Sequence, residues 1–139
     1  MYCIQQISQH HCFPACLVSF FSDLQLPLTQ SEIVNRCPEA FNKGTEIEGG
    51  VEPSLLHKVA NEFNIEIIRV QPNITINKHE SLFLFVHWKG DSTQNHCLRF
   101  CYKNSKFTYF MNPSSGKIEH ELSNILSSWV RLPLLIRKN

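Results

Sequence analysis

The sequence predicts an α+β fold in which N-terminal helices pack on a C-terminal antiparallel sheet. Apolar residues recur at helical spacing in the first half of the chain, and after Asn64 the pattern changes to the alternation that is typical of strands. Short polar turns join the later strands, as expected for antiparallel neighbours. The chain has 139 residues, of which 42% are hydrophobic, and no repeat or linker divides it. We therefore expect one stand-alone domain over residues 1–139.

The first helix is expected to begin at about Cys12 or Phe13 and to end before Pro27. Pro14 suits its first turn, where a missing N–H costs no hydrogen bond. The apolar stripe that should face the core consists of Phe13, Cys16, Leu17, Phe20, Phe21 and Leu24. Cys12 therefore lies at the N-terminus of a predicted helix.

Two further helices are expected before the strands begin. Thr29 and Glu32 have the spacing of a capping box, so a short helix should run from there to Cys37. Apolar residues on one face predict another helix over residues 53–63. Between these helices, residues 41–50 contain three glycines and are expected to form an open loop.

The second half of the chain reads mainly as strands. A short helix is expected around residues 118–127. Pro133 cannot donate a ladder hydrogen bond, which predicts that the last strand lies at an edge of the sheet. The expected strands are Ile65–Val70, Leu82–Trp88, His96–Tyr102, Phe107–Asn112 and Trp129–Ile136.

Charge and hydropathy exclude several classes of partner. The net charge is +1, from 13 basic and 12 acidic residues, and no basic stripe appears, so we expect no nucleic-acid binding. The longest apolar run, Leu82–Val86, has five residues, so we expect no membrane insertion. The first residues lack the features of a signal peptide. We therefore expect a cytoplasmic protein as synthesised, with secretion into a host cell as an effector as the alternative location.

Three residues form a candidate nucleophilic site. The turn at residues 103–106 folds two strands together, and a register in which residue numbers sum to 208 or 209 places His96 opposite Asn112 or Pro113. A histidine held by an amide is a suitable base for a cysteine nucleophile. Cys12 is the cysteine at a helix N-terminus, where the dipole and a nearby His96 should lower the thiol pKa.

Several segments around these residues have a recognisable order and spacing. They are residues 6–16, which read QISQHHCFPAC, residues 44–45 with the 53–63 helix, FLFVH at 83–87, HCLRF at 96–100 and NP at 112–113. The first is similar to the Q-x5-C-G-x-A-[AC] opening of the C39, or bacteriocin-processing, cysteine peptidases, a papain-like family. The last segments resemble the H…[DN]-P part of that family, and the resemblance covers roughly residues 4–116.

The resemblance implies a papain-like fold and acyl transfer through Cys12 to hydrolyse a peptide or protein substrate without a cofactor. It implies His96 as general base, Asn112 as the residue that orients the imidazole, and Gln6 as a donor to the oxyanion. There are two departures from the family pattern. Phe13 stands where glycine is usual, which should crowd the substrate or alter the loop at the nucleophile. Asn112 stands where aspartate is usual, although papain itself uses asparagine.

Three alternatives remain beside this interpretation. A glutamine deamidase of the bacterial effector type could use the same cysteine and histidine, and a C39-like domain could act as a non-catalytic binding module. The third alternative, a zinc site, would draw on His10, His11, Cys12, Cys16, His96, Cys97 and Cys101. The C-x3-C spacing, however, falls once on a helix and once on a strand, so we expect no metal. The thiols are expected to be reduced, and Cys16, Cys97 and Cys101 to serve packing.

Overall fold

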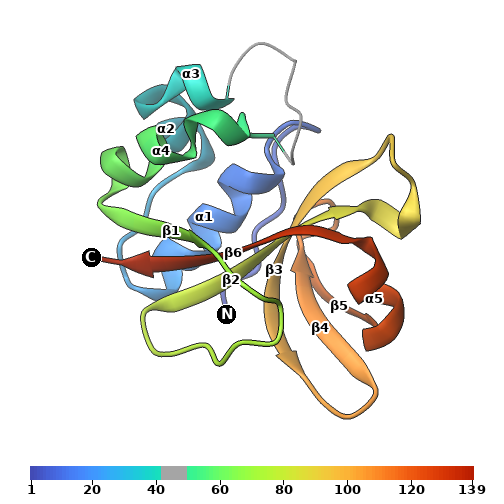
Figure 1. The fold of residues 1–139 in the computed structure, drawn as a ribbon. Helices are drawn as coiled ribbons and strands as arrows, with labels where there is room; N and C mark the ends of the chain where they lie inside the picture. Colours follow the sequence, from blue (N-terminus) through green and yellow to red (C-terminus); the bar gives the residue numbers. More distant parts are fainter. Residues whose placement is uncertain (42–49) are drawn as a thin grey trace.

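A computed structural model describes residues 1–41 and 50–139 as helices on both sides of one sheet (Figure 1). The helices are α1 (Cys12–Asp23), α2 (Gln30–Arg36), α3 (Pro38–Phe41), α4 (Leu56–Phe63) and α5 (Ser123–Trp129), with 3-10 turns η1 (Pro53–Leu55) and η2 (Trp88–Gly90). The strands are β1 (Ile65–Arg69), β2 (Glu80–His87), β3 (Asn95–Lys103), β4 (Phe107–Asn112), β5 (Lys117–Leu122) and β6 (Val130–Lys138). The predicted α+β class is confirmed.

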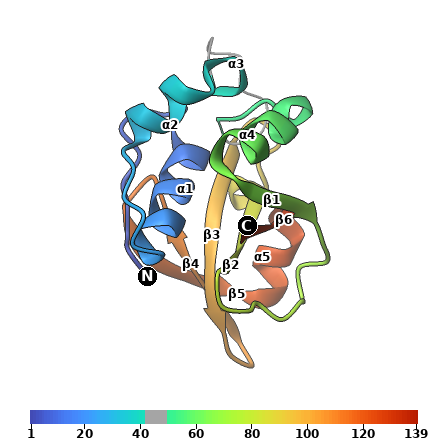
Figure 2. The ribbon, with the colours of Figure 1, turned by 90° about the vertical axis from the view of Figure 1, so that its left-hand side faces the viewer.

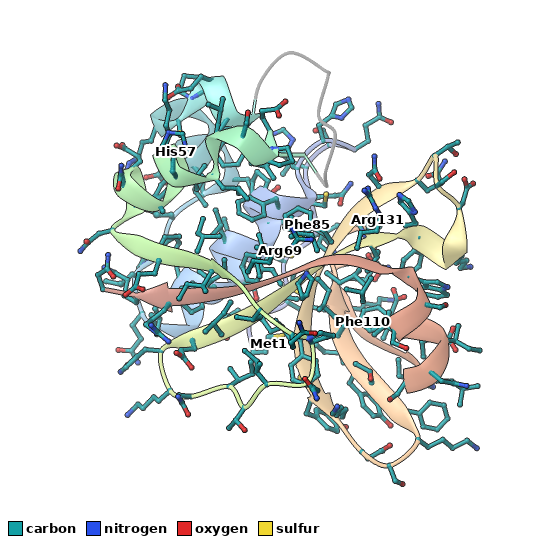
Figure 3. All side chains as sticks on the ribbon, in the orientation of Figure 1. Met1, His57, Arg69, Phe85, Phe110 and Arg131 are labelled. Carbon is teal, nitrogen blue, oxygen red and sulfur yellow. The ribbon has the colours of Figure 1, made fainter. Side chains whose placement is uncertain are left out.

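The six strands form a single antiparallel sheet in the order β1-β6-β2-β3-β4-β5. Alternating side chains divide the core into two clusters. Phe83 and Phe85 on β2 pack with α1 and the other N-terminal helices, whereas Leu82 and Leu84 pack with α5. Figure 2 shows α1 on one side of β3 and α5 on the other, and Figure 3 shows Phe85 and Phe110 in these two regions.

The first two helices follow the expected signals. α1 begins at Cys12 and ends at Asp23, before Pro27. α2 has the predicted capping box, because the Thr29 side chain accepts from the Glu32 amide and the Glu32 side chain accepts from the Thr29 amide. The predicted loop at residues 41–50 lies mostly outside the described residues, and so does the Gly44-Thr45 pair.

Two predictions about the last third of the chain are wrong. Residues 117–122 form strand β5, paired along β4, and the helix begins only at Ser123. Strand β6 lies between β1 and β2 instead of at an edge. The pairing of β1 with β6 ends at Arg69 and Leu134, and the Pro133 carbonyl just beyond it accepts the Val70 amide. Pro133 is tolerated because the N–H that it lacks would point to the side where β1 has already ended.

An ion pair between a buried arginine and an exposed aspartate joins the sheet to α1. The Arg99 guanidinium, on β3, donates to Ser81 Oγ and Ser19 Oγ at 2.7 Å each and lies 2.7 Å from an Asp23 carboxylate oxygen. Asp23 Oδ1 also accepts the Tyr2 amide at 2.8 Å. The same polar cluster therefore holds α1, β3 and the beginning of the chain together.

Within the described ranges, none of the helices combines the length and the apolar character that crossing a bilayer requires.

Candidate active site

The imidazole of His96, the second residue of strand β3, is held by the side-chain amide of Asn112. His96 Nε2 lies 2.7 Å from Asn112 Oδ1, and the His96 side chain is only 8% exposed. Asn112 Oδ1 also accepts the Ser114 amide at 3.0 Å, so the atom facing the ring is the amide oxygen. An amide oxygen cannot donate, so Nε2 carries the ring proton and Nδ1 keeps its lone pair.

The predicted pairing of His96 with Asn112 comes about through a different register. Arg99 lies opposite Met111 and Lys103 opposite Thr108, so the residue numbers sum to 210 or 211 instead of 208 or 209. The register shifts at Cys101, between Phe100 and Tyr102, where β3 has an extra residue. Extended along the strands, this register makes His96 and Asn112 diagonal neighbours, which remain within reach of each other.

A carboxylate behind Asn112 was not predicted from the sequence. Asn112 Nδ2 lies 3.2 Å and 3.1 Å from the two carboxylate oxygens of Glu119, and Ser115 Oγ donates to Glu119 Oε2 at 2.5 Å. Glu119 is on β5, where it lies opposite Phe110. The sequence does hold a signal for it: over residues 117–122, glutamates alternate with Ile118, His120 and Leu122, a pattern that indicates a strand and not the helix expected around residues 118–127.

Burial and hydrogen bonding act on His96 in opposite directions. Removal from water lowers the pKa of the imidazole, and this effect is the largest, while the bond to Asn112 and the negative charge of Glu119 raise it. The Trp88 ring packs edge-to-face on His96, with centroids 5.6 Å apart. Ser114 Oγ is 3.2 Å from Nε2. The His96 imidazole is therefore neutral at pH 7, and the Trp88 indole shields one side of it.

Cys12 is the first residue of α1, as predicted, but the expected low thiol pKa is wrong. The residue is 2% exposed, and burial raises the pKa of its thiol to about 12, with a smaller contribution from Cys16. Backbone amides of Cys97, Phe13 and Cys12 itself lower the pKa, but less than burial raises it. The thiol thus lies beside the β3 backbone at Cys97, the residue that follows His96, and is protonated at pH 7.

Phe13 fills the core instead of crowding the substrate. Its side chain is fully buried, and its ring packs on Phe41, Phe83 and Phe85 with centroids 5.5–6.0 Å apart. The residue after the nucleophile candidate therefore anchors the start of α1 to the sheet. The departure from glycine at this position has a packing explanation.

Gln6 lies in an N-terminal arm, defined as residues 1–11, that contains no helix or strand and contacts the turn after β4. The Gln6 amide donates to the Pro113 carbonyl at 2.8 Å, next to Asn112. Gln30, from α2, holds the arm on both sides of Gln6: its amide nitrogen donates to Gln5 O at 2.8 Å, and its oxygen accepts the Ile7 amide at 3.0 Å.

The side chain of Gln6 has an unusual environment. Among the side-chain N and O atoms of the described residues, Gln6 Oε1 is the one that is buried without a hydrogen-bond partner. A buried polar atom left unpaired costs about 1–3 kcal/mol, so such atoms are rare in folded proteins, and a catalytic role is one reason for keeping them. The Gln6 backbone is therefore fixed beside the Asn112-Pro113 turn, and its side-chain oxygen is buried and unpaired.

Two glycines allow the arm to approach the rest of the site. Gly50 has φ +86°, and a Cβ there would lie 2.2 Å from the His10 carbonyl oxygen. Gly116 has φ +68°, and a Cβ there would lie 2.8 Å from Gln5 Cβ. Both positions combine a left-handed backbone with a contact too close for any side chain.

The remaining cysteines pack as expected where they are buried. Cys16 and Cys97 are fully buried between α1 and β3, and the Cys16 thiol lies 3.7 Å from the Cys97 carbonyl oxygen. Cys101 is half-buried and, like the other cysteines, is a free thiol. In the part of the chain that the structure describes, no three His, Cys, Asp or Glu side chains are placed to hold a metal ion.

Comparison with known proteins assigns the chain to a family. Its residues 1–139 match the model of the peptidase C39 family. Among solved structures, it is similar to the peptidase domain of Streptococcus ComA, described as a bi-functional ABC transporter involved in a quorum-sensing pathway, with a TM-score of 0.75 and 15% identity over 100% of both chains. Comparison with curated proteins gave no match. The fold is thus the papain-like fold that the resemblance implied, and the chain belongs to the peptidase C39 family of cysteine peptidases.

Proposed function

We propose that this peptidase cleaves its substrate through Cys12 as nucleophile and His96 as general base, with Asn112 orienting the ring and Gln6 stabilising the oxyanion. The observation that carries the proposal is the 2.7 Å contact between His96 Nε2 and Asn112 Oδ1, because it leaves Nδ1 as the basic nitrogen. The same assignment is supported by the positions of the two residues, because Cys12 begins α1 and His96 lies on the neighbouring strand β3.

The resting thiol and imidazole are both neutral, which determines the order of proton transfers. The Cys12 proton passes to His96 Nδ1 as sulfur attacks the substrate carbonyl carbon, and the carbonyl electron pair moves to oxygen. Gln6 Nε2 and the Cys12 amide donate to that oxyanion. When the C–N bond breaks, the imidazolium gives its proton to the leaving amine, and a thioester remains.

Water completes the reaction. His96 Nδ1 accepts a proton from a water molecule as its oxygen attacks the thioester carbonyl, and the imidazolium returns the proton to the departing Cys12 sulfur. The products are a carboxylic acid and the free thiol. Family analogy indicates small residues, often glycine, before the cleaved bond, so we propose peptides of that type as substrates.

A cleavage assay with matched variants tests the proposal. Purified protein is incubated with a mixture of peptides that contain glycine, and the products are sequenced by mass spectrometry. We expect cleavage by wild type and by Cys3→Ala, whose thiol is exposed, and none by Cys12→Ala. Cleavage that persists in Cys12→Ala contradicts the assignment. Release of ammonia from glutamine side chains without cleavage would instead support the deamidase alternative.

A further inference from the structure

Glu119 is connected to His96 through a single amide. Asn112 accepts from His96 on its oxygen and donates to both Glu119 oxygens on its nitrogen, at 3.2 Å and 3.1 Å. Asn112 is 4% exposed, and the Ser115 hydroxyl donates to Glu119 Oε2. The four side chains therefore form one chain of hydrogen bonds from β3 across β4 to β5.

The carboxylate helps to select which end of the amide faces the ring. Oxygen and nitrogen of an asparagine side chain exchange places on a half-turn, and only their partners choose between the two states. A carboxylate can only accept, so Glu119 requires Nδ2 on its side and leaves Oδ1 for His96. The Ser114 backbone amide, which donates to Oδ1 at 3.0 Å, favours the same orientation. With the amide reversed, Nδ2 would face the ring, and His96 Nε2 would have to accept instead of donate.

Glu119 also provides the negative charge in this chain of hydrogen-bonded side chains. The side chains of Trp88, Asn112 and Ser114, which make ring or hydrogen-bond contacts with the His96 imidazole, are all uncharged. Glu119 is the charged group whose field raises the pKa of His96 against the effect of burial. An imidazolium formed during the reaction is stabilised by that carboxylate.

We propose that Glu119 is a positioning residue of this peptidase, which acts through Asn112 to hold His96 in the Nε2–H tautomer and to stabilise its protonated form. The role in catalysis rests on the function proposed above for His96. The geometric part, the choice of tautomer, does not depend on whether Cys12 reacts.

Nitrogen-15 NMR of the imidazole ring tests the tautomer directly, with His96→Gln used to assign the signal. In wild type we expect a protonated Nε2 and an unprotonated Nδ1 at neutral pH. Glu119→Gln carries an amide that can donate as well as accept, so the Ser114 backbone amide is then the remaining contact that favours the wild-type orientation of Asn112, and a reversed fraction becomes accessible. We expect a mixture of His96 tautomers and a lower His96 pKa in this variant.

Glu121→Gln is the matched control, because Glu121 lies two residues further along β5, on the same face, opposite Thr108. It should keep the wild-type tautomer and pKa of His96. Cleavage by Glu119→Gln should be slower by on the order of five-fold, a small part of the roughly 10²–10⁴-fold that a positioned acid–base group contributes. Glu121→Gln should be unaffected.

A charge exchange separates positioning from plain structural support. Asn112→Asp places a second carboxylate against Glu119, so this variant should cleave slowly. Asn112→Asp combined with Glu119→Gln returns one negative charge to the pair, next to the ring, and should recover most of the activity and the Nε2–H tautomer. A double variant no better than the worse single variant contradicts the proposal.

The remaining outcomes are distinguishable. A His96 tautomer and pKa in Glu119→Gln that equal those of wild type and Glu121→Gln would overturn the inference. If Glu119→Gln changes the tautomer but wild type cleaves no peptide, the function proposed for Cys12 and His96 fails while the positioning by Glu119 stands.

Discussion

The two halves of the candidate site differ in how they are prepared. On the imidazole side, His96, Asn112 and Glu119 are joined by hydrogen bonds that fix a tautomer and supply a charge. On the thiol side, burial outweighs three nearby amides and raises the pKa of Cys12 to about 12. The comparison teaches that the imidazole proposed as base is oriented in advance by hydrogen bonds, whereas the thiol proposed as nucleophile is held in its protonated form by burial.

The strongest test of this contrast removes the base. His96→Ala should slow peptide cleavage by roughly 10²–10⁴-fold, because the neutral thiol of Cys12 then has no group to accept its proton. Turnover and labelling of Cys12 by iodoacetamide at neutral pH measure the effect. A thiol that reacts equally fast without His96 would mean that the two halves act independently.

Replacing Asn112, whose side-chain amide connects His96 to Glu119, should have the next largest effect. Asn112→Ala should slow cleavage by about ten-fold or more, because an unheld ring samples unproductive tautomers. Asn112 is buried and not at an open cleft, and its loss leaves the Glu119 carboxylate with fewer donors, so the variant should also lose about 2 kcal/mol of unfolding free energy.

Turnover and urea unfolding of Asn112→Ala are compared with those of Asn104→Ala, a change in the exposed turn between β3 and β4. Because Asn104 caps that turn through its side-chain oxygen, its replacement should cost stability without changing turnover. Equal loss of turnover in both variants would show that the effect comes from the hairpin fold and not from the imidazole.

A smaller effect is expected at the arm that carries Gln6. Gln30→Ala removes two hydrogen bonds to the residues on either side of Gln6, at Gln5 O and the Ile7 amide. We expect about three-fold slower turnover with little change in KM, because an oxyanion donor acts in the transition state. The stability loss should be about 1–2 kcal/mol. Gln71→Ala, at an exposed loop position, is the control.

The smallest effect concerns stability at alkaline pH. The folded Cys12 thiol has a pKa of about 12, whereas in the unfolded chain it ionises near 9.0. Between these values only the unfolded state releases the proton, so the unfolding free energy falls as pH rises, by about 1.4 kcal/mol per pH unit for one thiol. Cys12→Ala should reduce this slope by close to one proton in urea unfolding between about pH 10 and pH 11. An unchanged slope would contradict the burial of the thiol.

The sequence predicts those parts of the site that depend on local signals. The apolar stripe and Pro14 locate the start of α1 at Cys12, and the short turn at residues 103–106 brings His96 and Asn112 together even though the register was wrong. An extra residue at Cys101 cannot be seen in an alternating pattern, because a bulge depends on the pairing of two strands.

The parts that the sequence did not predict depend on distant contacts. Glu119 was missed because residues 117–122 were interpreted as a helix, and only the pairing with β4 places its carboxylate at Asn112. The pKa of Cys12 was predicted in the wrong direction because the helix start is visible in the sequence but the surrounding burial is not. Pro133 was placed at an edge because the point where β1 ends is a tertiary property.

The attachment of the N-terminal arm has a consequence for the timing of assembly. Ile4 contacts Met111, and Gln5 contacts Ser114, at sequence separations of 107 and 109 residues. Contacts this distant form late, because long loops must close first. At ribosomal rates of roughly 5–20 residues per second, β4 is synthesised roughly 5–20 s after the arm that contacts it. A nascent chain that has not yet reached β4 therefore cannot bring the Gln6 segment against Pro113 or His96 against Asn112, so the proposed site is assembled only when synthesis of the fold is nearly complete.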